Sequence, residues 1–90
     1  MVMSKIPVYF MPGLAASPTI FENIKLPEDQ FEMHFLEWFL PNDKESIENY
    51  ALRMTEKIQD ENPVLVGVSF GGILVQEMAK HIKTQKVIII

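Results

Sequence analysis

The sequence predicts an α/β protein built on a parallel β-sheet. Short apolar runs rich in β-branched residues alternate along the chain with segments whose apolar residues recur at helical spacing. Residues 87–90 are all β-branched aliphatics, which is typical of a strand buried on both faces of a parallel sheet. A serine flanked by glycines separates one apolar run from the helical segment that follows it. Strands that alternate with helices require right-handed crossovers and therefore pair in parallel.

The composition indicates one small globular domain. The chain has 90 residues, and 48% of them are hydrophobic, which is enough to form a core. The net charge is −4 and the basic residues are scattered, so we expect no nucleic-acid partner. Cysteine is absent, which excludes disulfides and thiolate metal sites. Neither a membrane span nor a signal peptide is visible, so we expect a cytoplasmic protein.

The first predicted elements are a strand and a short helix. Residues 8–11 form a compact apolar run that Pro12-Gly13 closes, so we expect a strand there. Ser17 as N-cap and Pro18 at the first helical position predict a short helix, which ends at Pro27. Three apolar residues are predicted on its buried side: Ile20, Phe21 and Ile24.

A second strand and a longer helix follow. Residues 31–38 predict a strand, with His34 on the same face as Leu36 and Trp38. Asn42 or Ser46 is predicted to cap the next helix, and Asn62-Pro63 to end it. The buried stripe of this helix is predicted from apolar residues at helical spacing: Ile47, Tyr50, Ala51, Met54 and Ile58.

The last third of the chain predicts a strand, a turn, a helix and a strand. Residues 64–68 predict the first strand, residues 70 to about 82 the helix, and residues 87–90 the last strand. Proteins rarely end within such a strand, because an exposed apolar edge invites aggregation. We therefore expect this chain to be the front part of a longer protein.

Ser69, in the turn between strand and helix, carries the most specific chemical prediction. Residues 67–71 are a G-x-S-x-G motif, and this motif between a strand and a helix is typical of a nucleophile elbow. Because the turn is tight, the positions two before and two after the serine must lack a Cβ, which Gly67 and Gly71 satisfy. Gly72 then lets the helix pack close to the sheet. The alternative is an ordinary serine in a glycine-rich turn.

These residues resemble the α/β-hydrolase superfamily over essentially the whole chain. The similarity is closest at Phe10-Met11-Pro12-Gly13-Leu14 and at residues 67–72, although Pro12 replaces the histidine of the family's His-Gly-x loop. The resemblance implies a three-layer sandwich with the spatial strand order 31–38, 8–11, 64–68, 87–90. It also implies that Ser69 is the nucleophile and that the backbone N–H groups of Leu14 and Phe70 form the oxyanion hole.

The residues that would activate Ser69 are not apparent in this sequence. The family order is serine, acid, histidine, and only Glu77 and His81 follow Ser69. On a continuous helix they would lie about 12 Å and about 18 Å from it, and His34 would lie about 13 Å down the sheet, whereas a base must come within about 3 Å. We therefore expect the acid and the histidine beyond residue 90, and no activity from the 90-residue segment alone.

The sequence favours a serine hydrolase that cleaves a small-molecule carboxylic ester or thioester. Two alternatives stay open: an acyltransferase or lyase on the same fold, and a hydrolase-like binding or scaffold module without turnover. No histidine–carboxylate cluster has metal-ligand spacing and no nucleotide motif is present, so we expect neither a metal nor a cofactor. Trp38 and Phe39 are candidates to line the substrate pocket, or alternatively to anchor the following loop.

Overall fold

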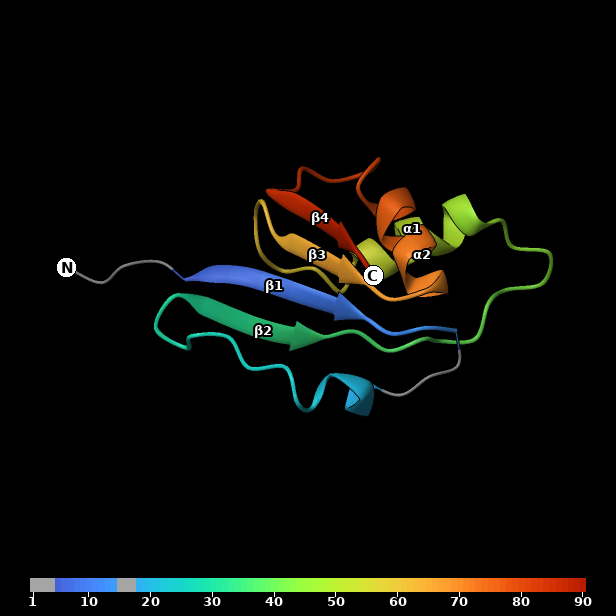
Figure 1. Cartoon of the computed structure of the whole chain (residues 1–90). Helices are drawn as coiled ribbons and strands as arrows, with labels where there is room; N and C mark the ends of the chain where they lie inside the picture. The colour runs from blue at the N-terminus through green and yellow to red at the C-terminus, as the bar shows by residue number, and fades with distance from the viewer. Residues whose placement is uncertain (1–4, 15–17) are drawn as a thin grey trace.

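The computed structural model describes residues 5–14 and 18–90, which form an α/β arrangement (Figure 1). Four strands make one sheet: β1 (Ile6–Met11), β2 (Phe31–Phe35), β3 (Val64–Gly67) and β4 (Lys86–Ile89). They are connected by a 3-10 helix and two α-helices: η1 (Pro18–Phe21), α1 (Ile47–Thr55) and α2 (Phe70–Met78). The predicted α/β class and parallel sheet are confirmed.

The strand order of the sheet is β2-β1-β3-β4, and every pairing is parallel. The chain first moves outward from β1 to β2 and then crosses back to β3, so its direction reverses between β1 and β3. The loops that follow these two neighbouring strands therefore leave the same edge of the sheet. Open α/β sheets bind ligands at such a reversal, outside the carboxyl ends of the strands.

The side chains of the strands divide between two cores, because successive residues point to opposite faces. On one face, Tyr9, Met11 and Leu65 pack with buried residues of α1 and α2. On the other face, Val8, Phe10 and Val66 pack with Phe21 of η1. The apolar stripe predicted for residues 47–58 faces the first of these cores.

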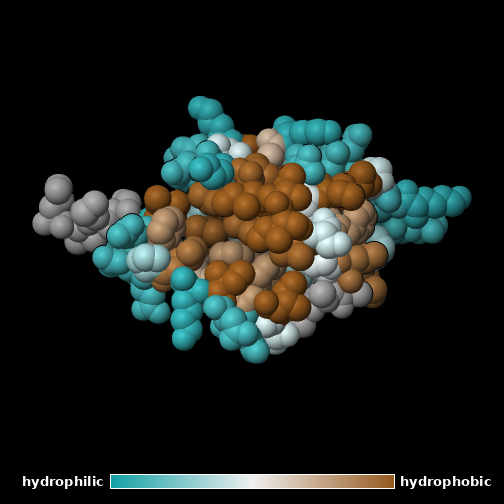
Figure 2. All heavy atoms as spheres, viewed as in Figure 1, coloured by the Kyte–Doolittle hydropathy of each residue, from teal (hydrophilic) through white to brown (hydrophobic). Residues whose placement is uncertain are grey.

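Both α-helices cover the same face of the sheet, so the expected three-layer sandwich is only partly formed by the described residues. Right-handed crossovers that run in one direction along the sheet lie on one face, and those that run the other way lie on the opposite face. Only the β1-to-β2 connection runs the other way, and η1 is the one helix among its described residues. Figure 2 shows apolar side chains gathered at the surface on this face. A pocket of about 480 Å³ is lined in part by six apolar residues of β1, β3, β4 and the end of the chain: Val8, Phe10, Val64, Val66, Ile88 and Ile90.

All four strand predictions need correction. β1 begins at Ile6 rather than at residue 8, and β3 ends at Gly67 rather than at residue 68. β2 ends at Phe35 rather than Trp38, because Leu36 N–H makes the last bond to β1 (2.8 Å to the Phe10 carbonyl) and the chain then turns toward α1. β4 begins one residue earlier than expected and is an edge strand. The exposed fractions of Ile88, Ile89 and Ile90 are 39%, 53% and 68%, so the expected burial on both faces is wrong for this chain. Among the described residues, no helix covers the face of β4 opposite to α1 and α2.

The helices are shorter than predicted. α1 ends at Thr55 and α2 at Met78, because each final turn tightens to bonds between residue i and the carbonyl of residue i−3. η1 ends at Phe21, well before Pro27, and Ile20 is half exposed rather than buried. The predicted N-cap Ser17 lies outside the described residues.

The N-terminus of α1 is fixed by a capping serine and an ion pair. Ser46, one of the two predicted caps, accepts a hydrogen bond from Asn49 N–H at 3.1 Å. The neighbouring Glu45 carboxylate is covered and accepts from Arg53 Nη2 at 2.6 Å and Nε at 2.7 Å. The Arg53 guanidinium also lies over the Phe39 ring, 4.4 Å from its centroid. These contacts hold the segment between β2 and α1 in place.

The Glu45–Arg53 pair predicts a pH dependence of stability. The hydrogen bonds from Arg53, opposed by burial and assisted by the Asn42 N–H and Asn49, lower the pKa of Glu45 from 4.5 to about 2. A depressed pKa in the folded state gives stability above pH 4.5 that is lost as the pH falls toward 2. We expect the urea midpoint to fall more steeply through this range in the wild type than in Glu45→Gln. Glu48→Gln, at an exposed position, should keep the steep fall, and equal slopes for the wild type and Glu45→Gln would contradict the assignment.

Candidate active site at the turn after β3

Ser69 forms the turn between β3 and α2. Its backbone angles are φ 56° and ψ −124°, a region that residues other than glycine rarely adopt. Such a conformation costs about 1–3 kcal/mol and occurs preferentially at functional sites. The residue is exposed, and its side chain makes no capping hydrogen bond to α2. The turn therefore presents the serine hydroxyl at the surface.

Two glycines make this turn sterically possible. A Cβ on Gly67 would lie 2.3 Å from the Gly71 carbonyl oxygen. A Cβ on Gly71 would lie 2.4 Å from the Pro12 oxygen and 2.5 Å from the Met11 oxygen. Gly72 is similarly close to the Ile89 side chain, at 2.6 Å. These distances leave no room for a side chain at positions 67 and 71, because the opposing atoms belong to the backbone.

The loop that follows β1 lies against the turn. Val68 N–H donates to the Met11 carbonyl at 3.1 Å, and a Cβ on Gly13 would be 3.7 Å from Ser69 Cβ. Trp38 connects the two segments. Its Nε1–H donates to the carbonyls of Gly13 (2.7 Å) and Pro12 (3.1 Å), and its ring stacks on Phe70 with centroids 5.7 Å apart. Trp38 thus fixes the 12–14 loop relative to the first residue of α2.

The backbone N–H groups of Leu14 and Phe70 belong to the two segments that meet at Ser69. Phe70 is the first residue of α2, where N–H groups lack intrahelical acceptors and the helix dipole favours negative charge. Leu14 follows Gly13, where an added Cβ would lie 3.7 Å from Ser69 Cβ. Within residues 5–14 and 18–90, neither N–H donates to a backbone carbonyl. Both are therefore candidates for an oxyanion hole.

An apolar groove of about 500 Å³ begins at these two residues and extends along the segment between β2 and α1. Trp38 and Phe39, the two candidate pocket residues, both line it, and Trp38 also anchors the 12–14 loop. The complete lining combines residues of the two loops with residues of α1: Leu14, Trp38, Phe39, Leu40, Pro41, Glu45, Ser46, Ile47, Tyr50 and Phe70.

Neither histidine lies within reach of Ser69. His34 lies on β2, opposite Tyr9 of β1, and β2 is two strands away from β3. Two strand spacings and four residues along the sheet separate His34 from Ser69 by about 16 Å. His81 is exposed beyond the end of α2, and the nine residues of that helix alone span about 13 Å. Glu77 pairs with Lys80 at 3.0 Å. The described residues therefore bring no general base to Ser69.

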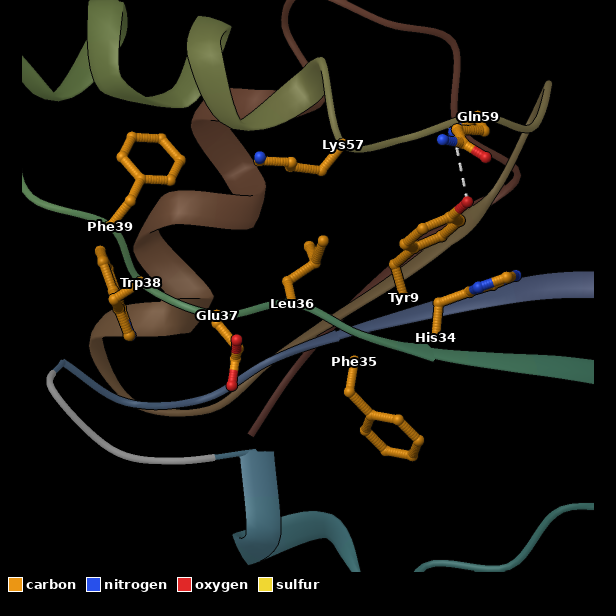
Figure 3. A pocket seen from close by; sticks show the side chains of 9 residues that line it. All are labelled: Tyr9, His34, Phe35, Leu36, Glu37, Trp38, Phe39, Lys57 and Gln59. Atoms are coloured by element: carbon orange, nitrogen blue, oxygen red, sulfur yellow. Dashed lines mark hydrogen bonds between the residues drawn. The ribbon is translucent and has the colours of Figure 1, made fainter.

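A second pocket, of about 480 Å³, lies between the sheet and the end of α1 (Figure 3). The rings of Tyr9 and His34 stack with centroids 4.4 Å apart. Tyr9 OH donates to Asp60 Oδ2 at 2.6 Å and accepts from Gln59 N–H at 3.2 Å, the bond drawn in Figure 3. Burial, and then the bond to Asp60, raise the pKa of Tyr9. Phe35 points away from these residues, toward η1.

Three side chains beside this pocket have the spacing of metal ligands. Glu32, His34 and Asp60 each offer one ligand atom, and the three atoms lie within 4.8 Å of one another. His34 Nε2 is 2.6 Å from Glu32 Oε1 and 3.6 Å from Asp60 Oδ2. The prediction that no histidine–carboxylate cluster has metal-ligand spacing was therefore wrong. The alternation of Glu32 and His34 on one face of a strand was a usable signal, but Asp60 joins them only through the fold.

In comparisons with known proteins, no protein-family model and no curated protein matches this chain. None of the described helices is long and apolar enough to cross a membrane.

Proposed function

We propose that this chain carries the nucleophile and the oxyanion hole of a serine hydrolase of the α/β-hydrolase superfamily, acting on a small-molecule carboxylic ester or thioester. The observation that carries the proposal is the backbone of Ser69. A non-glycine residue at positive φ, exposed between a strand and a helix and flanked by glycines that admit no Cβ, is the geometry that a nucleophile elbow requires.

In the proposed reaction, Ser69 Oγ forms a bond to the carbonyl carbon of the substrate. The carbonyl oxygen gains negative charge and accepts hydrogen bonds from Leu14 N–H and Phe70 N–H. The bond from this carbon to the alcohol oxygen or thiol sulfur then breaks, and the proton of Ser69 Oγ passes through a histidine to that leaving atom. Water subsequently cleaves the acyl–Ser69 ester.

The histidine and its acid are proposed to come from polypeptide outside these 90 residues. The support is the distance of His34 and His81 from Ser69, together with the pairing of Glu77 with Lys80. The same observation favours a second candidate function, a hydrolase-like binding or scaffold module in which Ser69 is never activated.

Covalent labelling separates the two functions. The full-length protein is expected to react with a fluorophosphonate probe, and peptide mass spectrometry should place the adduct on Ser69, because only an activated serine attacks phosphorus readily. An adduct on a different serine would overturn the assignment of the nucleophile. A protein that is folded but unreactive would favour the binding module.

Trp38 offers a test of the oxyanion hole. Trp38→Phe keeps a ring that can stack on Phe70 but removes both hydrogen bonds to the 12–14 loop. We expect Ser69 to be labelled roughly 10- to 100-fold more slowly, because a small displacement of Leu14 misplaces one oxyanion donor. Tyr9→Phe, which also removes a hydrogen bond from a buried aromatic residue, should leave the labelling rate unchanged. Equal rates in the Trp38→Phe variant and the wild type would contradict this role.

A further inference from the structure

The cluster of Glu32, His34 and Asp60 is assembled from two segments that are far apart in the sequence. Glu32 and His34 are two residues apart on β2, so their side chains point to the same face of the sheet. His34 lies opposite Tyr9, and both side chains leave the sheet on the same side (Figure 3). Asp60 comes from the segment between α1 and β3. The fold therefore brings one imidazole and two carboxylates together at β2.

The separations of the ligand atoms fit one small metal ion. His34 Nε2 and Asp60 Oδ2 are 3.6 Å apart, and the three ligand atoms lie within 4.8 Å of one another. A tetrahedral ion with bonds of about 2.0–2.2 Å places its ligand atoms about 3.3–3.6 Å apart. Glu32 Oε1, which is 2.6 Å from His34 Nε2, would have to move back by about 1 Å or less. The Glu32 side chain is 53% exposed, so it has room to rotate by this amount.

The charges of the cluster favour a divalent cation. Two carboxylates face one imidazole, and in residues 5–14 and 18–90 neither carboxylate forms an ion pair with a lysine or arginine. A protonated His34 would supply one positive charge against the two negative charges of Glu32 and Asp60. A divalent ion would balance both carboxylates and leave the imidazole neutral, which is the form that binds metals.

We propose that Glu32, His34 and Asp60 bind a divalent metal ion that accepts mixed nitrogen and oxygen ligands, zinc in particular. An imidazole nitrogen with two carboxylate oxygens suits zinc, whereas Mg²⁺ and Ca²⁺ prefer oxygen ligands alone. Three protein ligands leave the fourth position of a tetrahedral ion to water. The ion ties β2 to the segment that leads into β3. The site is separate from the proposed nucleophile, because His34 is about 16 Å from Ser69.

Tyr9 holds two of the three ligands in place. Its ring stacks on the His34 ring, with centroids 4.4 Å apart and planes inclined by 14°. Its hydroxyl donates to Asp60 Oδ2 at 2.6 Å and accepts from the Gln59 N–H at 3.2 Å. Groups that orient metal ligands in this way increase the affinity for the ion, because the ligands lose less freedom when it binds.

Calorimetric titration with zinc chloride tests the site. The full-length protein is first freed of metal with EDTA and dialysed. His34→Phe keeps a ring that can stack on Tyr9 but removes the ligand nitrogen, and should weaken zinc binding at least about 100-fold. His81→Phe makes the same change at an exposed position beyond α2 and should leave the affinity unchanged. Zinc should raise the thermal midpoint of the wild type and of His81→Phe, but not that of His34→Phe, because the complete site exists only in the folded protein.

Asp60→Asn is a second, independent variant. It removes the charge but keeps an oxygen that can accept from the Tyr9 hydroxyl, and should weaken zinc binding about tenfold or more. Glu61→Gln removes a charge from the next residue, which is exposed and outside the cluster, and should leave the affinity unchanged.

The outcomes for the metal site are separable from those for the proposed function. Equal zinc affinities of the wild type and His34→Phe would overturn the site, as would equal weakening by Asp60→Asn and Glu61→Gln. Magnesium that binds as tightly as zinc would overturn the assignment of the ion. None of these measurements involves Ser69, so an unreactive serine would leave the metal site standing, and failure to bind zinc would leave the hydrolase proposal standing.

Discussion

Replacing Ser69 by alanine is expected to abolish fluorophosphonate labelling of the full-length protein. The rate of ester hydrolysis should fall by roughly 10⁴-fold or more, because loss of the nucleophile leaves only oxyanion stabilisation and binding. The folded structure should survive, since the Ser69 side chain is exposed and caps nothing. Labelling is measured by mass spectrometry, hydrolysis with p-nitrophenyl acetate, and folding by circular dichroism.

Thr55→Val is the matched control for this substitution. It also removes one hydroxyl group, but from α1, where Thr55 bonds the Leu52 carbonyl and lies outside the proposed site. Its labelling and hydrolysis rates should equal those of the wild type. Undiminished labelling of the Ser69→Ala protein would rule out Ser69 as the nucleophile, whatever the control shows.

Replacing Gly71 by alanine is expected to cause the largest loss of stability. The new Cβ would lie 2.4 Å and 2.5 Å from two backbone carbonyl oxygens, those of Pro12 and Met11. Neither oxygen can move alone, because Met11 is the last residue of a central strand that pairs on both sides and Pro12 follows it directly. Separating α2 from this strand would open the core, so we expect a loss of at least about 3 kcal/mol in the free energy of unfolding. That is a large part of the stability of a small domain.

Gly13→Ala provides the comparison for Gly71→Ala. The Cβ added at Gly13 would meet its nearest atoms at 3.7 Å, an ordinary contact, and Gly13 does not have positive φ. Its free energy of unfolding should change by no more than about 0.5 kcal/mol. Urea unfolding of the two variants measures the difference. Similar midpoints for the two alanine variants would show that the turn is less tightly packed than these distances indicate.

The sequence by itself determined the features that depend on neighbouring residues. Ser46 caps α1 through a bond to a residue three positions later, and the helical stripe around Tyr50 and Met54 follows from local spacing. The α/β class follows in the same way from the alternation of short apolar runs with such stripes. The strand-serine-helix order around Ser69 is also local, because the whole motif spans five residues.

The tertiary structure decided whatever depends on residues far apart in the chain. Asp60 completes the cluster with Glu32 and His34 only because the segment after α1 brings its carboxylate to the Tyr9 hydroxyl. Trp38 contacts both Gly13 and Phe70 because β1 lies between β2 and β3. The exposure of β4 likewise depends on what packs against it. Apolar periodicity predicts which side of a helix or strand is buried. Only the packed fold determines which residues cover that side.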